Sequence, residues 1–377
     1  MKYAVLGASA LALTAASAQA GGIDRTGQSI DMIFKPGTYA ELSFGSARPE
    51  VSGSELAGLG QGDASSGDMT KGYLTLGLAL KHDYNEKLSV GIIYDQPFGA
   101  DVDYPTGTGY YAEGSNAEFN SEAFTLLGRY KLSERFSVHG GVRYQVVSAK
   151  AEVDNFINTL QAIDYEGQLE QASGFGYVVG AAYEIPDIAL RVALTYNSEI
   201  TTKHDTTEVN NGAIGNTPST ESDIEITTPQ SVNLAFQTGV AADTLLFGGV
   251  RWVNWSEFDI TPDVYEAVTG GPLVAYENDT YTYSLGVGRR FSPEWAGSVS
   301  IGYEEQNGDI VSNLGPTDGF WSLGLGAAYT FENVEVSMGA RYVWIGDAET
   351  RNAVAEPAGS FEDNTALGVG MKIGVTF

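Results

Sequence analysis

Cysteine is absent from this chain of 377 residues, and histidine occurs only three times. Without cysteine the protein has no disulfide, no thiol nucleophile and no thiolate ligand for a metal. None of the histidines accompanies a serine in a recognisable nucleophile context, and three are few for a zinc site. The sequence therefore predicts a protein that is not an enzyme, with no catalytic residues, no metal and no cofactor.

Basic residues are also scarce, since 20 Lys and Arg stand against 48 Asp and Glu, for a net charge of −28. A surface of this sign repels phosphate backbones and anionic lipid head groups. This balance excludes nucleic acid as a partner.

Long apolar runs are missing except at the start of the chain. Lys2 precedes an apolar stretch at residues 4–16, and Ala18-Gln19-Ala20 places small residues where a signal peptidase cuts. This layout predicts a signal peptide at residues 1–20. No later segment approaches the roughly 20 apolar residues that a spanning helix needs. A membrane crossing by the mature chain would therefore use strands.

What the sequence does contain is alternation with a period of two residues. From Leu74 to Leu80, every second residue is leucine, and the residues between are small or polar. An apolar face and a polar face repeated over about ten residues are typical of membrane barrel strands. We predict fourteen such strands, beginning near Thr38, Lys71, Leu88, Ser121, Phe136, Gly174, Asp187, Pro229, Thr244, Thr280, Trp295, Gly319, Glu335 and Thr365.

The predicted connections alternate in length, as they do in outer-membrane barrels with short periplasmic turns and long external loops. Tight turns are expected at Asn85-Glu86, Ser133-Glu134, Pro186-Asp187, Ala241-Asp243, Ser292-Pro293 and Glu332-Asn333. Long loops are expected at 201–228 and 257–278. The fold class is therefore all-β, a fourteen-stranded antiparallel transmembrane β-barrel over residues 38–377 in a Gram-negative outer membrane. The alternative is a soluble β-sandwich, whose apolar faces would need a partner sheet.

The cations of the strands fall on the faces opposite the apolar ones. They are Lys81, Arg129, Lys131, Arg143, Arg191, Arg251, Arg290, Arg341 and Lys372. Because a cation on the lipid face costs about 2–4 kcal/mol near the midplane, we assign them to the lumen. There the arginines either pair with Glu41, Asp95 and Glu335, or some of the cations guide an anionic ligand. The acidic residues gather in the loops, where they are solvated or bridge to lipopolysaccharide through divalent cations.

Two stretches carry a resemblance to a known family. Residues 94–100 (YDQPFGA) and 249–258 (GVRWVNWSEF) resemble the FadL family of long-chain fatty acid transporters, and the layout of the whole mature chain is similar. The resemblance implies a monomer that passively transports hydrophobic molecules, with a lumen plug and a lateral opening at a kinked third strand. The terminal Phe377 also looks like the signal that such barrels present to their assembly machinery.

The third strand contains residues that fit a kink. Pro97 lacks the N–H that a ladder needs, and Gly99 tolerates unusual dihedral angles, so strand pairing is expected to break there. Alternatively, Pro97 simply ends the strand at the external mouth. Residues 21–37 are expected to form a short plug, with Phe34 in its apolar part, although the family's Asn-Pro-Ala element is missing.

An external groove for the ligand is expected at the third loop. Residues 154–163 have helical spacing, which predicts a short amphipathic helix, although a loop packed on itself would show the same residues. A fatty acid carboxylate would bind Arg129 or Arg251. The candidate ligand-binding or gating residues are Phe34, Asp95, Pro97, Phe98, Gly99, Phe156, Leu160, Arg129 and Arg251. The alternative functions are a general diffusion pore and a structural outer-membrane barrel.

Overall fold

The computed structural model describes residues 22–56, 63–157, 160–351 and 357–377, so the predicted signal peptide lies outside the described residues. The strands of the main sheet are β1 (Tyr39–Glu50), β3 (Tyr73–Asp83), β4 (Leu88–Asp95), β5 (Gly99–Asp103), β6 (Asn116–Lys131), β7 (Phe136–Ile157), β8 (Leu160–Ile185), β9 (Leu190–Asn197), β10 (Ile200–Asn210), β11 (Thr217–Thr228), β12 (Ser231–Ala241), β13 (Thr244–Val253), β16 (Thr280–Arg290), β17 (Trp295–Glu304), β19 (Phe320–Phe331), β20 (Val334–Ile345) and β23 (Thr365–Thr376). Smaller elements are η1 (Asp31–Phe34), β2 (Ser54–Glu55), η2 (Pro186–Ile188), η3 (Trp255–Glu257), β14 (Asp259–Ile260), α1 (Asp263–Thr269), β15 (Val274–Ala275), β18 (Ile310–Val311), β21 (Ala348–Thr350) and β22 (Gly359–Phe361).

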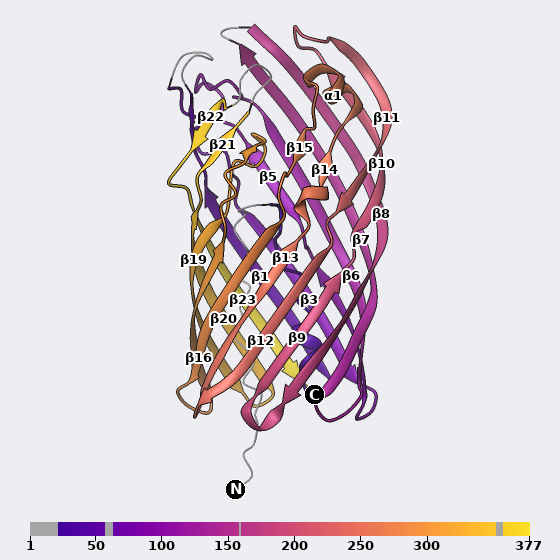
Figure 1. The fold of residues 1–377 in the computed structure, drawn as a ribbon, viewed down its shortest axis with the longest axis vertical. Helices are drawn as coiled ribbons and strands as arrows, with labels where there is room; N and C mark the ends of the chain where they lie inside the picture. Colours follow the sequence, from indigo (N-terminus) through magenta and orange to yellow (C-terminus); the bar gives the residue numbers. More distant parts are fainter. Residues whose placement is uncertain (1–21, 57–62, 158–159, 352–356) are drawn as a thin grey trace.

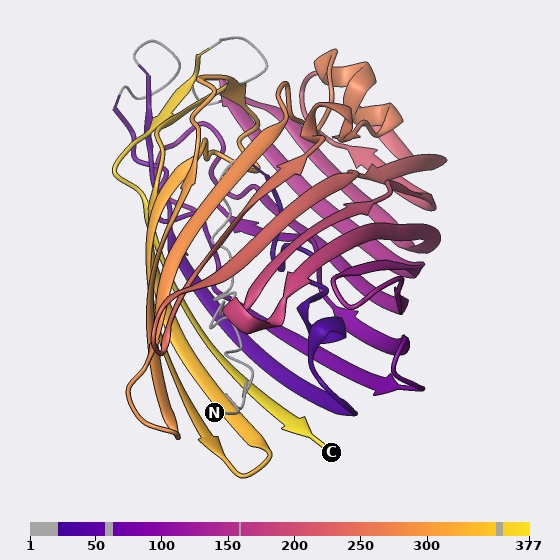
Figure 2. The same ribbon diagram turned by 60° about the horizontal axis from the view of Figure 1, so that its bottom comes forward.

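The main sheet closes on itself, because β1 pairs antiparallel with both β3 and β23. Figure 1 shows the resulting tall barrel of tilted strands, and in Figure 2 the strands surround the lumen. Three wall strands consist of two pieces each, namely β4 with β5, β9 with β10, and β11 with β12. The seventeen pieces therefore make fourteen wall strands, which confirms the predicted antiparallel barrel.

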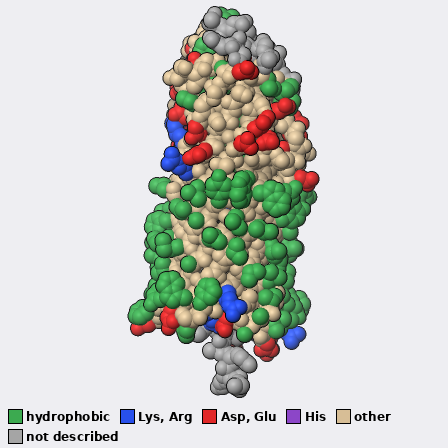
Figure 3. All heavy atoms as spheres, turned by 90° about the vertical axis from the view of Figure 1, so that its left-hand side faces the viewer, with side chains coloured by type: hydrophobic (Ala, Val, Ile, Leu, Met, Phe, Trp, Pro, Cys, Tyr) green, Lys and Arg blue, Asp and Glu red, His purple; other side chains and the backbone are tan. Residues whose placement is uncertain are grey.

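The alternation in the sequence determines which side of each strand faces lipid. Every second residue from Leu74 to Leu80 is exposed, whereas Ala79 and Lys81 between and beside them are buried in the lumen. Figure 3 shows the result on one side of the barrel, where hydrophobic side chains cover the lower part and acidic side chains lie above them. Within the described ranges, no helix has the length and apolar character required of a membrane span.

One predicted external loop is instead part of the wall. Residues 201–228 form most of β10 and β11, which pair from Ile200↔Thr228 upward. Most inward side chains of β10 are polar and hydrogen-bonded, so the strand lacks the apolar alternation that predicted the others. His204 does not lie in an acidic loop, since it is fully buried in β10 between Thr202 Oγ1 (2.7 Å) and the carbonyl oxygen of Glu170 (2.7 Å).

The predicted helix at residues 154–163 is also wrong. β7 continues to Ile157 and β8 begins at Leu160, with Asp154 opposite Asp164 in the ladder. The physical reason is continuity of hydrogen bonding: β7 and β8 already pair below, and extending that ladder satisfies backbone groups that an isolated short helix would leave open. The barrel wall consequently rises high on this side (Figure 1).

Candidate functional site

The N-terminal segment, residues 22–37, lies inside the lumen. Its 3₁₀ turn η1 contacts β3, β4 and β6, and Figure 2 shows it among the strands near the periplasmic end. Met32 and Ile33 are buried against Ile93 and Leu127 of the wall. An apolar turn inside a polar lumen is held there by the loss of apolar surface from water.

Phe34 of this segment lies between two arginines. The guanidinium carbons of Arg129 and Arg191 are 4.7 Å and 4.6 Å from its ring centroid, and His139 packs edge-on at 6.0 Å. Arg191 also pairs with Asp31 at 3.3 Å. Cation–π contacts of this kind contribute about 0.5–1 kcal/mol each at exposed sites and more when desolvated. They fix the periplasmic end of the segment.

A second anchor holds the external end of the segment. Arg251 Nε donates to Asp24 Oδ2 at 2.5 Å, and its Nη1 donates to Ser231 Oγ at 3.0 Å and Asn233 Oδ1 at 2.9 Å. Arg129 is likewise paired with Glu184. Both arginines that the sequence suggested for a ligand carboxylate therefore have a protein carboxylate as partner.

The third wall strand is interrupted where the sequence predicted. β4 ends at Asp95 and β5 begins at Gly99. The N-terminal segment completes the ladder from inside, because Arg25 N donates to Pro97 O at 2.8 Å and Gly99 N donates to Ile23 O at 2.8 Å. The break is thus real, and its backbone groups are satisfied by residues near the start of the described chain and by Ser121 Oγ of β6, which bonds to the N–H and the carbonyl oxygen of Phe98.

The neighbouring strand is also left open at this level. The pairing of β3 with β4 stops at Leu78↔Tyr94, and among the described residues the rest of β3 has no strand partner on that side. The side chain of Gln96 takes the place of a strand there, because Leu76 N donates to Gln96 Oε1 at 2.9 Å. The wall is therefore closed at this level by a side chain instead of a ladder.

Gly99 makes room for Arg25 at the same place. A Cβ on Gly99 would lie 2.3 Å from Arg25 Cζ, which no side chain could tolerate without moving the arginine. From this position the guanidinium carbon lies 4.2 Å from the ring centroid of Tyr73 on β3. Arg25 therefore spans the interruption from β5 to β3.

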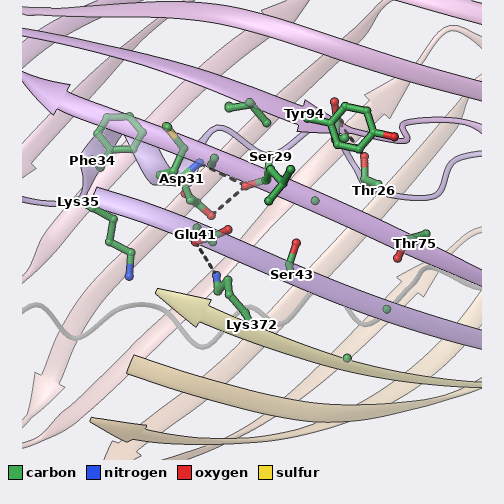
Figure 4. Close-up of a pocket in the computed structure, with 18 of the residues that line it drawn as sticks. Thr26, Ser29, Asp31, Phe34, Lys35, Glu41, Ser43, Thr75, Tyr94 and Lys372 are labelled. Atoms are coloured by element: carbon green, nitrogen blue, oxygen red, sulfur yellow. Dashed lines mark hydrogen bonds and ion pairs between the residues drawn. The ribbon is translucent and has the colours of Figure 1, made fainter. Parts of the chain in front are cut away.

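An inner cavity of about 300 Å³ surrounds the segment on its periplasmic side (Figure 4). Its lining includes Thr75–Ala79 of β3 and Ile93–Asp95 of β4, which border the interruption. Lys372 pairs with Glu41 at 3.5 Å and Lys35 with Glu335 at 3.7 Å. Lysines and not the expected arginines are thus the partners of these two glutamates.

Asp95 also has a partner other than the arginine that the sequence suggested. Its Oδ2 accepts a hydrogen bond from Thr26 Oγ1 at 3.0 Å. Arg143 is near enough to interact with it electrostatically. Asp95 thus connects the end of β4 to the N-terminal segment.

An outer, apolar pocket of about 40 Å³ lies in the external half of the lumen. Its lining consists of Ile23, Ala100, Ala117, Phe119, Ala149, Ala151, Leu169, Phe258, Ile260, Leu273, Val274, Tyr276 and Leu314, with Glu118 and Lys150. The side chains of these two charged residues are partly exposed and pair with each other at 2.9 Å. The pocket itself is lined by apolar side chains.

The structure brings together some of the candidate residues and separates others. Asp95, Pro97, Phe98 and Gly99 gather around the N-terminal segment, and Phe98 packs on Trp255 of the second family-like stretch at 5.7 Å between ring centroids. Phe34, Arg129 and Arg251 are its anchors. Phe156 and Leu160 lie at the tip of the β7–β8 hairpin, where Leu160 is 54% exposed, and they line neither cavity.

Sequence reasoning missed Arg25, Tyr73 and Gln96. Each acts across the interruption through a contact between residues at least twenty positions apart, Arg25 with Tyr73 and Gln96 with Leu76. Nothing in local periodicity marks such a contact. Only the predicted break at Pro97 could have directed attention to the residues around it.

Comparisons with known proteins agree with this fold. A FadL homologue from Pseudomonas aeruginosa has a TM-score of 0.74 at 13% identity, with 97% of this chain and 98% of that chain covered. The toluene transporter TodX of P. putida reaches 0.65 at 11% identity, covering 92% of each chain. The toluene transporter TbuX of Ralstonia pickettii reaches 0.60 at 11% identity, covering 96% and 97%. Such low identities establish the fold alone.

Sequence comparison places the chain in a family. A search of curated protein sequences finds no match. The family model described as outer membrane protein transport protein (OMPP1/FadL/TodX) matches residues 12–377. Because that match covers nearly the whole chain, the protein belongs to the OMPP1/FadL/TodX family of outer-membrane β-barrels that transport hydrophobic compounds.

Proposed function

We propose that this barrel passively takes up long-chain fatty acids or similar hydrophobic molecules, captures them in the outer apolar pocket, and releases them sideways at the interruption of the third strand. The observation that carries the proposal is the interruption itself, which the side chains of Gln96 and Arg25 bridge to β3. Transport of this kind runs down a concentration gradient and needs no energy source.

A straight path through the lumen is unfavourable for a hydrophobic molecule. Below the outer pocket, the lumen contains the Asp24–Arg251 pair and Arg143, whose guanidinium donates to Thr125 Oγ1 (2.9 Å) and Asn197 Oδ1 (3.1 Å). Displacing these contacts with an alkyl chain would leave buried polar groups without partners, at about 1–3 kcal/mol each. A polar layer of this kind favours a sideways route.

The sideways route needs few changes. Moving the Gln96 side chain costs one hydrogen bond to β3, and the outward Leu78 beside it is already exposed to lipid. By contrast, separating a normal strand pair would break a continuous ladder. A hydrophobic ligand leaving here passes from an apolar pocket to the acyl chains of the outer membrane, with only a short polar barrier.

In this proposal the N-terminal segment, with the boundaries predicted as 21–37, acts as the plug. Its anchors at Arg251 and Phe34 and its ladder bonds to the broken strand support that role. A ligand carboxylate has no free arginine at Arg129 or Arg251. We therefore propose that the head group stays near the rim of the outer pocket until release.

The test compares two substrates. Cells with and without the gene are given labelled oleate, and liposomes containing the purified barrel are tested for swelling in sugars. Oleate uptake without sugar flux supports the proposal. Sugar flux without oleate dependence would instead establish a general diffusion pore, and the absence of both would favour a structural barrel.

A further inference from the structure

The long loop between β13 and β16, residues 254–279, folds over the outer pocket and is here called the lid. Its two short strands pair antiparallel through Asp259↔Ala275 and Ile260↔Val274, and α1 lies between them. The inner face of the lid supplies one side of the pocket, through Phe258, Ile260, Leu273, Val274 and Tyr276. Figure 1 shows α1 at the external end, beside β10 and β11.

A single wall residue holds the start of α1. Glu208 of β10 is fully buried, and its Oε2 accepts hydrogen bonds from Val264 N (2.9 Å) and Tyr265 N (3.3 Å). The other partners of this carboxylate belong to the wall, namely Ser222 Oγ at 3.0 Å and Tyr165 Oη at 3.2 Å. Its charge is favourably placed, because backbone N–H groups at a helix start are open donors.

Apolar packing supplements this contact. Val264 is buried with Ile163 and Tyr165 of β8, and the rings of Tyr165 and Tyr265 are 5.0 Å apart. Burial raises the pKa of the Tyr265 phenol to about 12, so the ring stays neutral. The tip of the lid is thus attached to the wall by Glu208 and this small cluster, and a hydrogen bond from Ser312 Oγ to Leu273 O at 2.9 Å holds the segment that follows α1.

The base of the lid is fixed more firmly. Asp279 accepts hydrogen bonds from Trp252 Nε1 (2.9 Å), Asn254 Nδ2 (2.9 Å) and Ser256 Oγ (2.6 Å). Burial opposes the charged form of Asp279, but these hydrogen bonds outweigh it and lower its pKa. An opening motion would therefore leave the base in place and detach the tip.

The closed pocket cannot accept a ligand as it stands. Its volume of about 40 Å³ compares with about 300–1,000 Å³ for ordinary small-molecule sites, and Phe258, Ile260 and Leu273 of the lid are all buried. The wall side of the pocket belongs to the antiparallel ladders of β5–β8, with a register shift between Val147 and Ala149. Ile23 of the N-terminal segment and Leu314 of the loop after β18 complete the lining, and the lid supplies the larger part that can move without breaking the barrel.

We propose that Glu208 is the latch of this lid and acts as a positioning residue for transport, so that ligand entry requires α1 to detach from Glu208. The inference rests on the proposed function for its transport consequence, but the latch itself concerns only access to the outer pocket. The two are therefore measured separately.

The first measurement follows access to the pocket without any ligand. Because the chain has no cysteine, Ala151→Cys places a single thiol in the pocket lining, where Ala151 is 5% exposed. The rate of its labelling by a maleimide on intact cells reports lid opening. Glu208→Ala should raise that rate by roughly tenfold, the factor that corresponds to about 1.4 kcal/mol.

The matched control is Ser222→Ala, which removes a hydrogen bond to the other oxygen of the same carboxylate and does not touch the lid. It should leave the labelling rate near that of the parent. Retention of heat-modifiable migration on gels shows that each variant is a folded barrel. Equal labelling rates in Glu208→Ala and Ser222→Ala overturn the latch.

The second measurement locks the lid. Ile163→Cys with Val264→Cys joins two neighbours in the same buried cluster, and the disulfide should abolish uptake of labelled oleate until a reductant restores it. The control pair, Thr201→Cys with Thr227→Cys, joins β10 to β11 where the two hydroxyls are 2.8 Å apart and should not affect uptake. A mobility shift verifies that each disulfide forms.

The outcomes separate the two proposals. Full oleate uptake through the locked lid overturns the latch while the transport function stands. Faster labelling in Glu208→Ala, with no oleate uptake even by the wild-type barrel, supports the latch and overturns the proposed substrate. If Glu208 only stabilised the fold, Glu208→Ala would lose heat-modifiable migration together with uptake. In that case the Ile163→Cys, Val264→Cys disulfide would not block uptake in a way that a reductant reverses.

Discussion

The backbone N–H of Arg25 lies 2.8 Å from the carbonyl oxygen of Pro97 and donates a hydrogen bond to it. This bond joins the N-terminal segment to the one place where the third wall strand is broken. The ladder of the barrel is therefore completed from the inside at this level. Movement of the segment would free the carbonyl oxygen of Pro97 and the N–H of Gly99, so the segment and the break form one structural unit.

Replacing both Pro97 and Gly99 with valine should slow uptake of hydrophobic molecules by about tenfold or more. Valine at position 97 restores an N–H, and a side chain at position 99 displaces the Arg25 guanidinium, whose Cζ would be 2.3 Å from its Cβ. The restored N–H and the β-branched residue at position 99 favour a continuous strand, and this pairing replaces the lost bridge of Arg25. The measurement is the initial rate of labelled oleate uptake by cells.

The matched control for this variant is Pro229→Val, at the interruption between β11 and β12, which lies elsewhere in the wall. It should not alter uptake. Unchanged uptake in the Pro97 and Gly99 variant would remove the lateral route. A loss of uptake in both variants would point to a general effect on barrel assembly.

Arg251→Ala should make the closed barrel conduct ions. The substitution leaves Asp24 without its partner inside the lumen, at a cost of about 3 kcal/mol, which loosens the N-terminal segment. Single-channel recording in planar bilayers should show open events that the wild type lacks. Arg290→Ala breaks the partly exposed pair with Asp243 and should behave as the wild type. Identical traces for all three proteins would refute an anchoring role for Arg251.

Phe34→Ala should increase the mobility of residues 30–35 without affecting the barrel wall. Its ring contributes two cation–π contacts, to Arg129 and Arg191, and packs in the buried cluster around η1. We expect a loss of about 3 kcal/mol in local stability. Hydrogen exchange followed by mass spectrometry should show faster exchange in the segment. The lipid-facing Phe44→Ala is the control, and equal protection in both variants would contradict the prediction.

Lys81→Met should destabilise the junction between the N-terminal segment and the first wall strand. Lys81 is 3% exposed, and its Nζ donates to Lys35 O (2.6 Å) and Gly37 O (3.0 Å) and pairs with Asp83 (2.5 Å). Removing these bonds leaves buried carbonyl groups unsatisfied, at about 2 kcal/mol. The temperature of heat-modifiable unfolding should fall, whereas Lys131→Met, on an exposed side chain at the periplasmic end, should leave it unchanged.

Much of the barrel could be predicted from the sequence because contact with lipid favours an apolar side chain at every second position of each strand. The alternating leucines of β3 are exposed to lipid as their period predicts, and the predicted tight turns join consecutive strands at the periplasmic end. The break at Pro97 was also predictable, since proline cannot donate to a ladder whatever its surroundings. The role of Phe377 in assembly stays a prediction.

The strands above the membrane were not predictable in the same way. β10 and β11 contain inward polar residues such as Thr202 and His204. Their outward residues do not contact lipid, so these positions need not be apolar. The β7–β8 hairpin overrode a helical pattern because its ladder was already established below. Here the tertiary structure decided, since strand pairing satisfies backbone groups regardless of apolar period.

The sequence by itself thus determined the class of protein, the barrel and the position of the broken strand, because each follows from local chemistry repeated along the chain. Only the tertiary structure decided what fills the break and what closes the pocket. Arg25 meets Gly99, and Glu208 meets Val264, through closure of the barrel, which brings together residues that are far apart in sequence. Such contacts leave no trace in local patterns.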